Sequence, residues 1–269
     1  MAYVYTYEEL EKNLATFRQL FPQIPVFSIG KSREGRHLYG LKLGKGGKRI
    51  FFNGAHHGME WLTAKLLMQF AEELARGDHN AETLLGNRTL YIVPMVNPDG
   101  VEIAATGKEW QASAAGVDLN HNYDALWHLS KQGEKSVGVF GPGPTRFSGA
   151  FPESEPESRA VADFTRQNSF DLVLAFHSQG EVIYWDFCGF APDKSYTLAK
   201  RFEAVSPYQM DTAGGIAAFG GYKDWFIRTF KRPGFTIEIG MGKNPLPIED
   251  LPRIYQRTLP LMLEAIKYQ

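Results

Sequence analysis

The sequence has one cysteine, Cys188, in 269 residues. A framework of internal disulfide bonds is therefore excluded, and a single thiol fits a reducing compartment. Net charge is also nearly absent, because 29 lysines and arginines face 30 aspartates and glutamates, which leaves a formal charge of −1. Without an excess of positive charge, the chain offers no electrostatic basis for binding nucleic acid or an anionic membrane.

Long apolar runs are missing as well. No segment approaches the roughly 18 consecutive apolar residues that a transmembrane helix needs. The first residues, Met1–Thr6, lack the basic and apolar regions of a secretory signal. We therefore expect a cytoplasmic protein without a membrane partner. The chain also shows no repeat, low-complexity segment or linker, so residues 1–269 are expected to form a single catalytic domain.

Strand-like and helix-like segments alternate after residue 49, which predicts an α/β fold with a mostly parallel central sheet and helices on both faces. Strands are expected at 26–29, 38–43, 49–54, 89–94, 171–176, 182–187 and 235–240. Helices are expected at 6–21, 61–76, 194–205, 222–230 and 248–268, with a further helix that begins at Ser154 as its N-cap. Thr6 is the expected N-cap of the first helix.

Two features of this pattern have further consequences. The first three strands follow one another closely, so we expect them to form an antiparallel edge on a mixed sheet. Residues 97–152 lack periodicity and are rich in Gly, Ser and Pro, which predicts a long loop region. A loop of that length inside a compact domain is usually functional.

His57 and Glu60 stand three residues apart where a strand-like run gives way to a helix-like run. Side chains in this arrangement can point at one spot beyond the strand end, where ligands bind in open α/β sheets. With a third protein ligand and one position left to water, such a pair can hold a catalytic zinc ion. The same residues also fit an ordinary turn histidine and a glutamate in the first turn of a helix.

His177 and Glu238 occupy similar positions on later strands. His177 follows a buried strand and precedes a glycine turn, so it emerges at the same sheet edge unless it is simply a core histidine. Glu238 lies on the opposite face of its strand from the apolar residues. An unpaired buried carboxylate is costly, but one beside a metal site can serve as a general base. A solvent-facing glutamate on an edge strand is the alternative.

Four motifs in order resemble those of the zinc carboxypeptidase family, the M14 peptidases, over about residues 5–265. The motifs are His57-x-x-Glu60, Gly116-Val117-Asp118-Leu119-Asn120, His177 after an apolar strand, and Thr236-Ile237-Glu238 before a glycine. The resemblance implies one Zn²⁺ per chain, held by His57, Glu60 and His177, with Glu238 as the general base. The family spacing also favours His57 over the adjacent His56. The implied fold, a mixed and mostly parallel sheet between helices, agrees with the strand pattern.

The chain departs from the family where substrate is held. Members that trim ordinary peptides have an Asn-Arg pair where this chain has Asn120-His121, and an arginine where it has Met59. They also use an arginine to stabilise the oxyanion, whereas this chain has none between residues 88 and 146. An imidazole does not reproduce the bidentate guanidinium fork. We expect Asn120 and His121 to bind a substrate carboxylate. Arg146 is expected to make a second contact with an anionic group of the substrate.

Two further residues need an interpretation. The family's substrate-binding tyrosine would fall near Ile216, so that role is unassigned, with Tyr222 and Tyr208 as candidates. Cys188 lies in an apolar, aromatic stretch, which predicts a buried filler rather than a nucleophile.

Several segments are similar to a bacterial branch of the family, the γ-D-glutamyl-L-diamino acid peptidases. These segments are Ala55–Trp61, Pro152–Glu157, and His177–Glu181 with Ile183–Trp185. The resemblance implies hydrolysis of peptidoglycan stem peptides between D-glutamate and meso-diaminopimelate, and absence of a leader fits intracellular muropeptide recycling. A conventional metallocarboxypeptidase and an inactive zinc-binding peptide sensor, suggested by the missing arginines, are the alternatives. The oligomeric state is left open.

Overall fold

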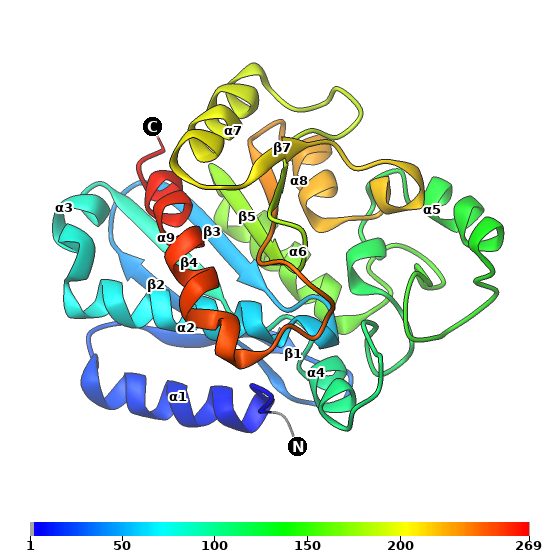
Figure 1. The fold of residues 1–269 in the computed structure, drawn as a ribbon, viewed down its shortest axis with the longest axis horizontal. Helices are drawn as coiled ribbons and strands as arrows, with labels where there is room; N and C mark the ends of the chain where they lie inside the picture. Colours follow the sequence, from blue (N-terminus) through cyan, green and yellow to red (C-terminus); the bar gives the residue numbers. More distant parts are fainter. Residues whose placement is uncertain (1–2, 269) are drawn as a thin grey trace.

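The computed structural model describes residues 3–268, and gives the backbone alone for Ile216 and Ala217. An eight-stranded mixed sheet forms its centre, and helices cover both faces (Figure 1). The expected α/β class and mostly parallel sheet are confirmed. Within the described part of the chain, no helix combines the length and the apolar character needed to cross a bilayer.

The strands run in the order β1-β2-β4-β3-β5-β8-β6-β7 across the sheet. Their bounds are β1 Val26–Lys31, β2 His37–Gly44, β3 Lys48–Gly54, β4 Arg88–Val93, β5 Leu172–His177, β6 Val182–Tyr184, β7 Gln209–Asp211 and β8 Gly234–Glu238. Strands β4, β3, β5 and β8 are mutually parallel and form the middle of the sheet. The antiparallel strands β1 and β2 form one edge, as predicted for the first two strands.

The prediction that the third strand also belongs to this edge is wrong. Strand β3 lies in the middle of the sheet, paired with β4 and β5, because the chain returns through helices and inserts β4 between β2 and β3. The strand expected at 182–187 ends at Tyr184. The carboxylate of Asp186 accepts hydrogen bonds from the backbone N–H groups of Gly189 and Ala191 and turns the chain there. Strand β7 was not predicted.

The described helices are α1 Tyr7–Leu20, α2 Trp61–Arg76, α3 Ala81–Leu85, α4 Pro98–Ala105, α5 Trp127–Glu134, α6 Pro156–Asn168, α7 Asp193–Val205, α8 Tyr222–Phe230 and α9 Leu251–Ile266. Thr6 caps α1 as expected, since its hydroxyl accepts a hydrogen bond from the Glu9 N–H. The expected Ser154 cap is wrong: α6 has Glu155 at its N-cap, and the Ser154 hydroxyl binds the Asn122 amide instead. The expected loop at 97–152 contains α4 and α5.

Two hydrophobic cores fill the space on either side of the sheet. Phe52, Phe235 and Ile237 belong to the core that includes residues of α1, α2, α7 and α9. Phe51 and Val173 belong to the other core, with residues of α6 and α8. Neighbouring residues of one strand therefore enter opposite cores, as strand geometry requires. The predicted apolar face of strand 235–240 is confirmed, and its other face, with Thr236 and Glu238, points towards α8.

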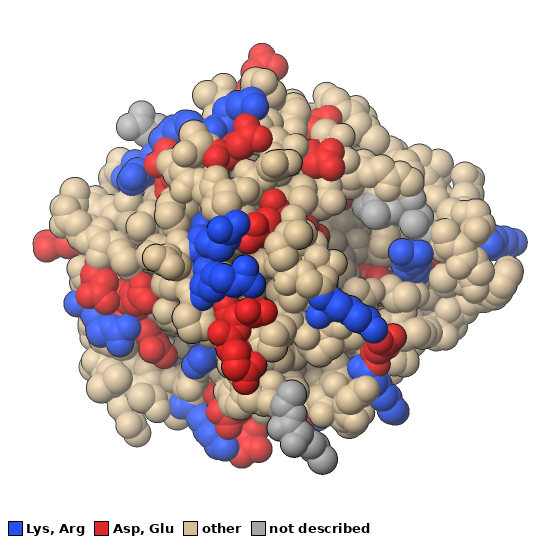
Figure 2. Space-filling model, viewed as in Figure 1, with Lys and Arg blue, Asp and Glu red and all other residues tan. Residues whose placement is uncertain are grey.

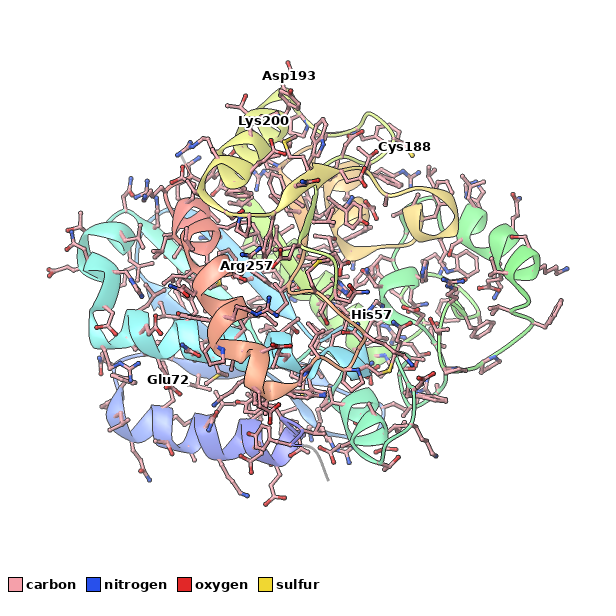
Figure 3. All side chains as sticks on the ribbon, viewed as in Figure 1. His57, Glu72, Cys188, Asp193, Lys200 and Arg257 are labelled. Atoms are coloured by element: carbon pink, nitrogen blue, oxygen red, sulfur yellow. The ribbon has the colours of Figure 1, made fainter. Side chains whose placement is uncertain are left out.

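Cys188 is exposed, so the prediction of a buried thiol is wrong. The residue follows the buried Phe187 in a turn and has a left-handed backbone, with φ of 50°. This turn directs the thiol to the surface, at the periphery of the molecule and well away from His57 (Figure 3).

Candidate metal centre and its cavity

The carboxyl ends of three neighbouring parallel strands bring the predicted site residues together. Strand β3 ends at Gly54, shortly before His57, and a 3₁₀ turn from Gly58 to Glu60 leads into α2. Strand β5 ends at His177 and β8 at Glu238, and these two residues are register partners in adjacent strands. Gly58 is required in the turn, because a Cβ atom there would lie 2.3 Å from the carbonyl oxygen of Gly100.

His57, Glu60 and His177 converge on one point. Glu60 Oε1 lies 2.8 Å from His57 Nδ1, and Glu60 Oε2 lies 2.8 Å from His177 Nδ1. The two Nδ1 atoms are 3.3 Å apart. Among the residues that the structure describes, this is the one group of three His, Cys, Asp or Glu side chains whose ligand atoms all lie within 4.8 Å of one another. Two imidazole nitrogens and a carboxylate form a donor set that suits zinc.

The electrostatics of this group favour a cation. Burial disfavours the charge on Glu60, but His57 and His177 outweigh it and lower the pKa of Glu60 to about 2. Burial likewise opposes a charge on His57, and the carboxylates of Glu60 and Asp118 reverse this and raise the pKa of His57 well above its ordinary value. The buried carboxylates thus hold positive charge between them, which a divalent ion would supply directly.

Asp118 is a site residue to which the sequence analysis gave no role. Its Oδ1 lies 3.1 Å from His57 Nε2, on the side of the ring that faces away from Glu60. Asp118 is buried, and its other oxygen accepts a hydrogen bond from the Arg146 N–H. A carboxylate on the far nitrogen fixes the tautomer and orientation of a ligand histidine. The only signal in the sequence was its place between apolar neighbours in the 116–120 motif.

Glu238 lines a cavity of about 340 Å³ together with the two histidines of the metal group, His57 and His177. A hollow is visible right of the centre of this face of the molecule, where acidic and basic side chains are otherwise interspersed (Figure 2). Burial, and next the charge of Glu60, raise the pKa of Glu238 well above its ordinary value. A carboxylate with raised pKa beside a cation site can take up and return a proton.

The structure brings two of the four predicted substrate-binding residues to this cavity. Asn120 and His121 line it. The Asn120 side-chain oxygen accepts a hydrogen bond from the Tyr222 N–H, and His121 Nδ1 lies 2.9 Å from the Phe219 carbonyl oxygen. Their remaining polar atoms, Nδ2 and Nε2, have no hydrogen-bond partner within the described part of the chain.

The other predicted residues lie elsewhere. Arg146 has an exposed side chain that does not line the cavity, and it reaches the site through its backbone N–H alone. Tyr222 is fully buried with its hydroxyl 2.9 Å from the Thr165 hydroxyl, so we drop it as a substrate contact. The other candidate, Tyr208, is buried with its hydroxyl 2.6 Å from the Thr258 hydroxyl. Lys223 and Asp224 line the cavity instead, and the sequence analysis missed both.

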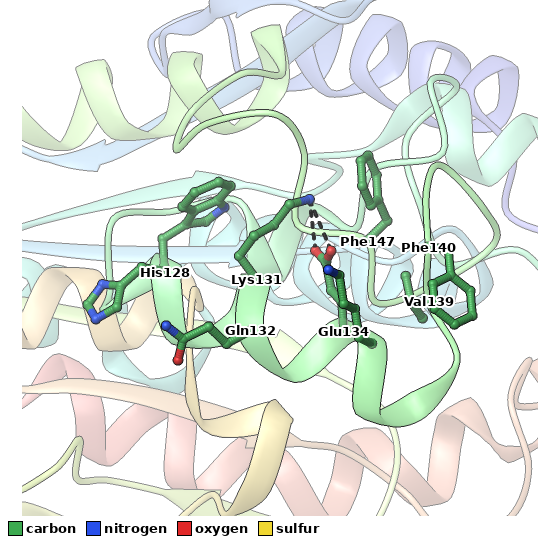
Figure 4. A pocket seen from close by; sticks show the side chains of 9 residues that line it. His128, Lys131, Gln132, Glu134, Val139, Phe140 and Phe147 are labelled. Carbon is green, nitrogen blue, oxygen red and sulfur yellow. Dashed lines mark hydrogen bonds and ion pairs between the residues drawn. The ribbon is translucent and has the colours of Figure 1, made fainter.

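A second cavity, of about 570 Å³, lies between α5 and the segment that follows it (Figure 4). In its wall the Lys131 ammonium pairs with Glu134 and lies 4.0 Å from the centre of the Phe147 ring. It contains none of the metal-site residues. This cavity therefore does not take part in the chemistry considered below.

The fold and the site together define a mononuclear metallohydrolase: two histidines and a carboxylate at the ends of parallel strands, with a second carboxylate beside them. Residues 10–260 match the model of one family, described as zinc carboxypeptidase. The chain belongs to this family and is a zinc metallopeptidase, and the His57, Glu60 and His177 group fits the zinc ion that the family uses.

The chain is also similar to individual proteins over most of its length. The chain is 34% identical, over 97% of its length and 72% of the relative's, to γ-D-glutamyl-L-diamino acid endopeptidase 1 of Lysinibacillus sphaericus. It is 30% identical to the uncharacterized protein YqgT of Bacillus subtilis, over 98% of this chain and 77% of the relative. The fold matches bovine thrombin-activatable fibrinolysis inhibitor with a TM-score of 0.83, at 22% identity over 99% of this chain and 96% of that one.

Proposed function

We propose that this zinc peptidase hydrolyses the amide bond between γ-D-glutamate and meso-diaminopimelate in peptidoglycan stem peptides. The observation that carries the proposal is the composition of the cavity. It unites His57 and His177 of the metal group with Glu238 and the Asn120-His121 pair, and its described lining contains no arginine. An ordinary carboxypeptidase site would need a bidentate grip on the C-terminal carboxylate.

The relative with 34% identity supports the choice of bond, because its name states that it acts on γ-D-glutamyl-L-diamino acid peptides. Peptides of this class carry carboxylates beside the scissile bond. Asn120 can donate from its amide nitrogen, and His121 can donate from Nε2 when the ring is charged, since its Nδ1 is engaged with the Phe219 carbonyl. The two side chains can therefore bind one carboxylate of the substrate by hydrogen bonds, without the bidentate ion pair that an arginine would form.

The roles of the remaining residues follow from their positions. Zinc bound by His57, Glu60 and His177 would polarise the scissile carbonyl and acidify a water molecule. Glu238 orients the attacking water, accepts its proton and returns a proton to the leaving amine. Asp118 holds the His57 ring through Nε2, so that Nδ1 faces Glu60 and His177, with which it would bind the ion. The buried, closely packed strand ends keep these groups in place before substrate arrives.

Mass spectrometry of the zinc-loaded protein with L-Ala-γ-D-Glu-meso-diaminopimelate tests the proposal. We expect L-Ala-D-Glu and free meso-diaminopimelate as the products. The isomer joined through the α-carboxyl of D-glutamate serves as the matched substrate control and should be cleaved more slowly.

Two results would contradict the proposal. Cleavage of ordinary L-peptides at their C-terminus with no cleavage of the tripeptide would favour a conventional carboxypeptidase. Binding of zinc and tripeptide without any product would favour an inactive sensor.

A further inference from the structure

A buried ion pair forms part of the wall of the cavity. Lys223 and Asp224 lie in the first turn of α8 and line the same cavity as His57, His177 and Glu238. Their side chains are almost fully enclosed, with exposed fractions of 3% for Lys223 and 7% for Asp224. Charged residues are rarely buried to this extent unless they are paired.

Lys223 and Asp224 line a different part of the cavity from the metal group. Thr236 also lines the cavity, and it precedes Glu238 by two residues on the same face of β8, so the cavity continues along this strand beyond Glu238. Helix α8 packs on β8 and β5, which places its first turn over that continuation. A substrate with its scissile bond at the metal group would extend on one side towards α8, and the leaving residue is assigned to that side.

Both charges keep hydrogen-bonding capacity for a ligand. The Lys223 ammonium donates to the Asp186 carbonyl oxygen at 2.7 Å and pairs with Asp224, which leaves one of its three donors. Asp224 Oδ1 is buried against that ammonium, and within the described part of the chain the Asp224 carboxylate accepts no hydrogen bond of ordinary geometry. The wall therefore offers one free ammonium donor of Lys223 next to one free acceptor, Asp224 Oδ2, within the described part of the chain.

A buried ion pair contributes little to stability compared with well-packed apolar residues. Packing alone therefore does not account for two charges with open hydrogen-bonding positions in the wall of a ligand cavity. The pair is complementary to a group that carries both a positive and a negative charge. Asp211 at the exposed rim of the same cavity adds a second acceptor for a cation.

We propose that Lys223 and Asp224 bind a zwitterionic amino-acid group at the end of the leaving residue's side chain, with Lys223 on its carboxylate and Asp224 on its ammonium. This inference rests on the proposed function, in which the leaving residue is meso-diaminopimelate. The far end of that side chain carries both an ammonium and a carboxylate. Lysine offers the ammonium alone, and 2-aminopimelate offers the carboxylate alone.

The test compares kcat/KM of the zinc-loaded protein for γ-D-Glu-X, where X is meso-diaminopimelate, L-lysine, L-2-aminopimelate or L-norleucine. We expect the meso-diaminopimelate substrate to exceed the norleucine substrate by about 100-fold or more, and each singly charged substrate to lie between them, because each charge-assisted hydrogen bond contributes roughly tenfold. Lys223→Met should remove the preference for a carboxylate and keep that for an ammonium. Asp224→Asn should do the reverse.

Ratios between substrates, measured on one preparation, do not depend on the fraction of folded enzyme. They therefore remain informative when a variant is unstable. If either single variant fails to fold because it leaves one charge unpaired, Lys223→Met/Asp224→Asn removes both charges and should give nearly equal kcat/KM for all four substrates. Lys200→Met, on α7 and far from His57 in Figure 3, is the control that should leave the ratios unchanged.

The failure of this inference is distinguishable from failure of the proposed function. Cleavage of all four γ-D-Glu substrates at similar rates would overturn the inference and leave the proposed function standing. A parallel series of N-acetyl-L-Ala-X peptides covers the opposite case. If only that series is cleaved, with meso-diaminopimelate preferred through Lys223 and Asp224, the proposed bond is wrong and the inference holds. Variants that slow every substrate equally would show a purely structural role.

Discussion

Glu60 connects the two histidines of the metal group, because each of its carboxylate oxygens meets a different imidazole. Its burial, with 2% exposure, excludes water as a competing partner. The neighbouring Glu238 has no such partner among the described residues and keeps a raised pKa. From these different surroundings we propose different roles for two carboxylates of the same chemical type, Glu60 as a ligand and Glu238 as the base.

Replacing Glu238 by glutamine tests this division of roles. An amide cannot accept the proton of the attacking water, so we expect kcat to fall by about 10²- to 10⁴-fold. The zinc content, measured by atomic absorption, should stay at the wild-type level because Glu238 is not a ligand. Glu249→Gln, at an exposed position, is the matched control. Turnover within tenfold of wild type would show that Glu238 is not the base.

Replacing Asp118 by asparagine tests the support of His57. The amide can present either its oxygen or its nitrogen to His57 Nε2, and it lacks the negative charge that strengthens the ligand. We expect zinc affinity to fall by about 10- to 100-fold. Competition with a chelator of known affinity measures the change, and Asp124→Asn, at an exposed position, is the control. Unchanged affinity would place Asp118 outside the metal site.

The convergence of His57, Glu60 and His177 could be predicted from the sequence because these residues stand near strand ends and in motifs of fixed spacing. The partners of those residues could not. Asp118 meets His57 across 61 positions, and only the packed loop brings them together. Tyr222 shows the opposite case. It directly precedes two residues that line the cavity, but its own hydroxyl lies in the core beside Thr165. Contacts of this kind depend on tertiary structure and leave no local pattern.

At the level of elements, the N-terminus of α6 contains a buried carboxylate that the mechanism does not use. Glu157 is fully buried, and its Oε1 accepts a hydrogen bond from the Arg33 N–H in the turn between β1 and β2. Its Oε2 has no partner within the described residues. Burial, only partly offset by the hydrogen bond from Arg33, raises the pKa of Glu157 to about 7.

This pKa predicts a pH-dependent stability. In the folded protein Glu157 keeps its proton up to about pH 7, whereas in the unfolded chain it loses the proton near its ordinary pKa of 4.5. The folded state therefore binds more protons between these values, and its stability falls as the pH rises through this window. The contribution of Glu157 to the loss is of the order of 3 kcal/mol, from about 1.4 kcal/mol per pKa unit.

Urea unfolding at pH 5 and pH 8 measures this effect. Glu157→Gln should be close to wild type at pH 5 and more stable than wild type at pH 8, because the amide carries no charge to bury. Glu82→Gln, at an exposed position, should follow wild type at both values. An equal effect of Glu157→Gln at both pH values would show that the carboxyl group does not titrate in this window.

The elements themselves were predicted to different degrees. Helix α2 and helix α8 begin and end where the periodicity of their apolar residues predicts. The short helices α4 and α5 were missed because their surroundings are rich in glycine and polar residues. The central position of β3 was missed for another reason: strand order is set by the crossover through α2, and no pattern within the strand encodes it.

On the scale of the whole molecule, the parallel middle of the sheet determines where the site forms. Strands β3, β5 and β8 end side by side, so residues from three distant parts of the chain reach one edge. The hydrophobic cores on both faces hold these strand ends in register. This arrangement leads to one central prediction, namely that His57, Glu60 and His177 hold one zinc ion per chain.

Anomalous diffraction at the zinc absorption edge, from crystals of the zinc-loaded protein, tests this claim most directly. We predict one strong peak per chain, about 2.0–2.2 Å from His57 Nδ1, His177 Nδ1 and a Glu60 oxygen. A fully ordered site without a peak, or a peak bound by other residues while His177 points away from His57 and Glu60, would contradict the account.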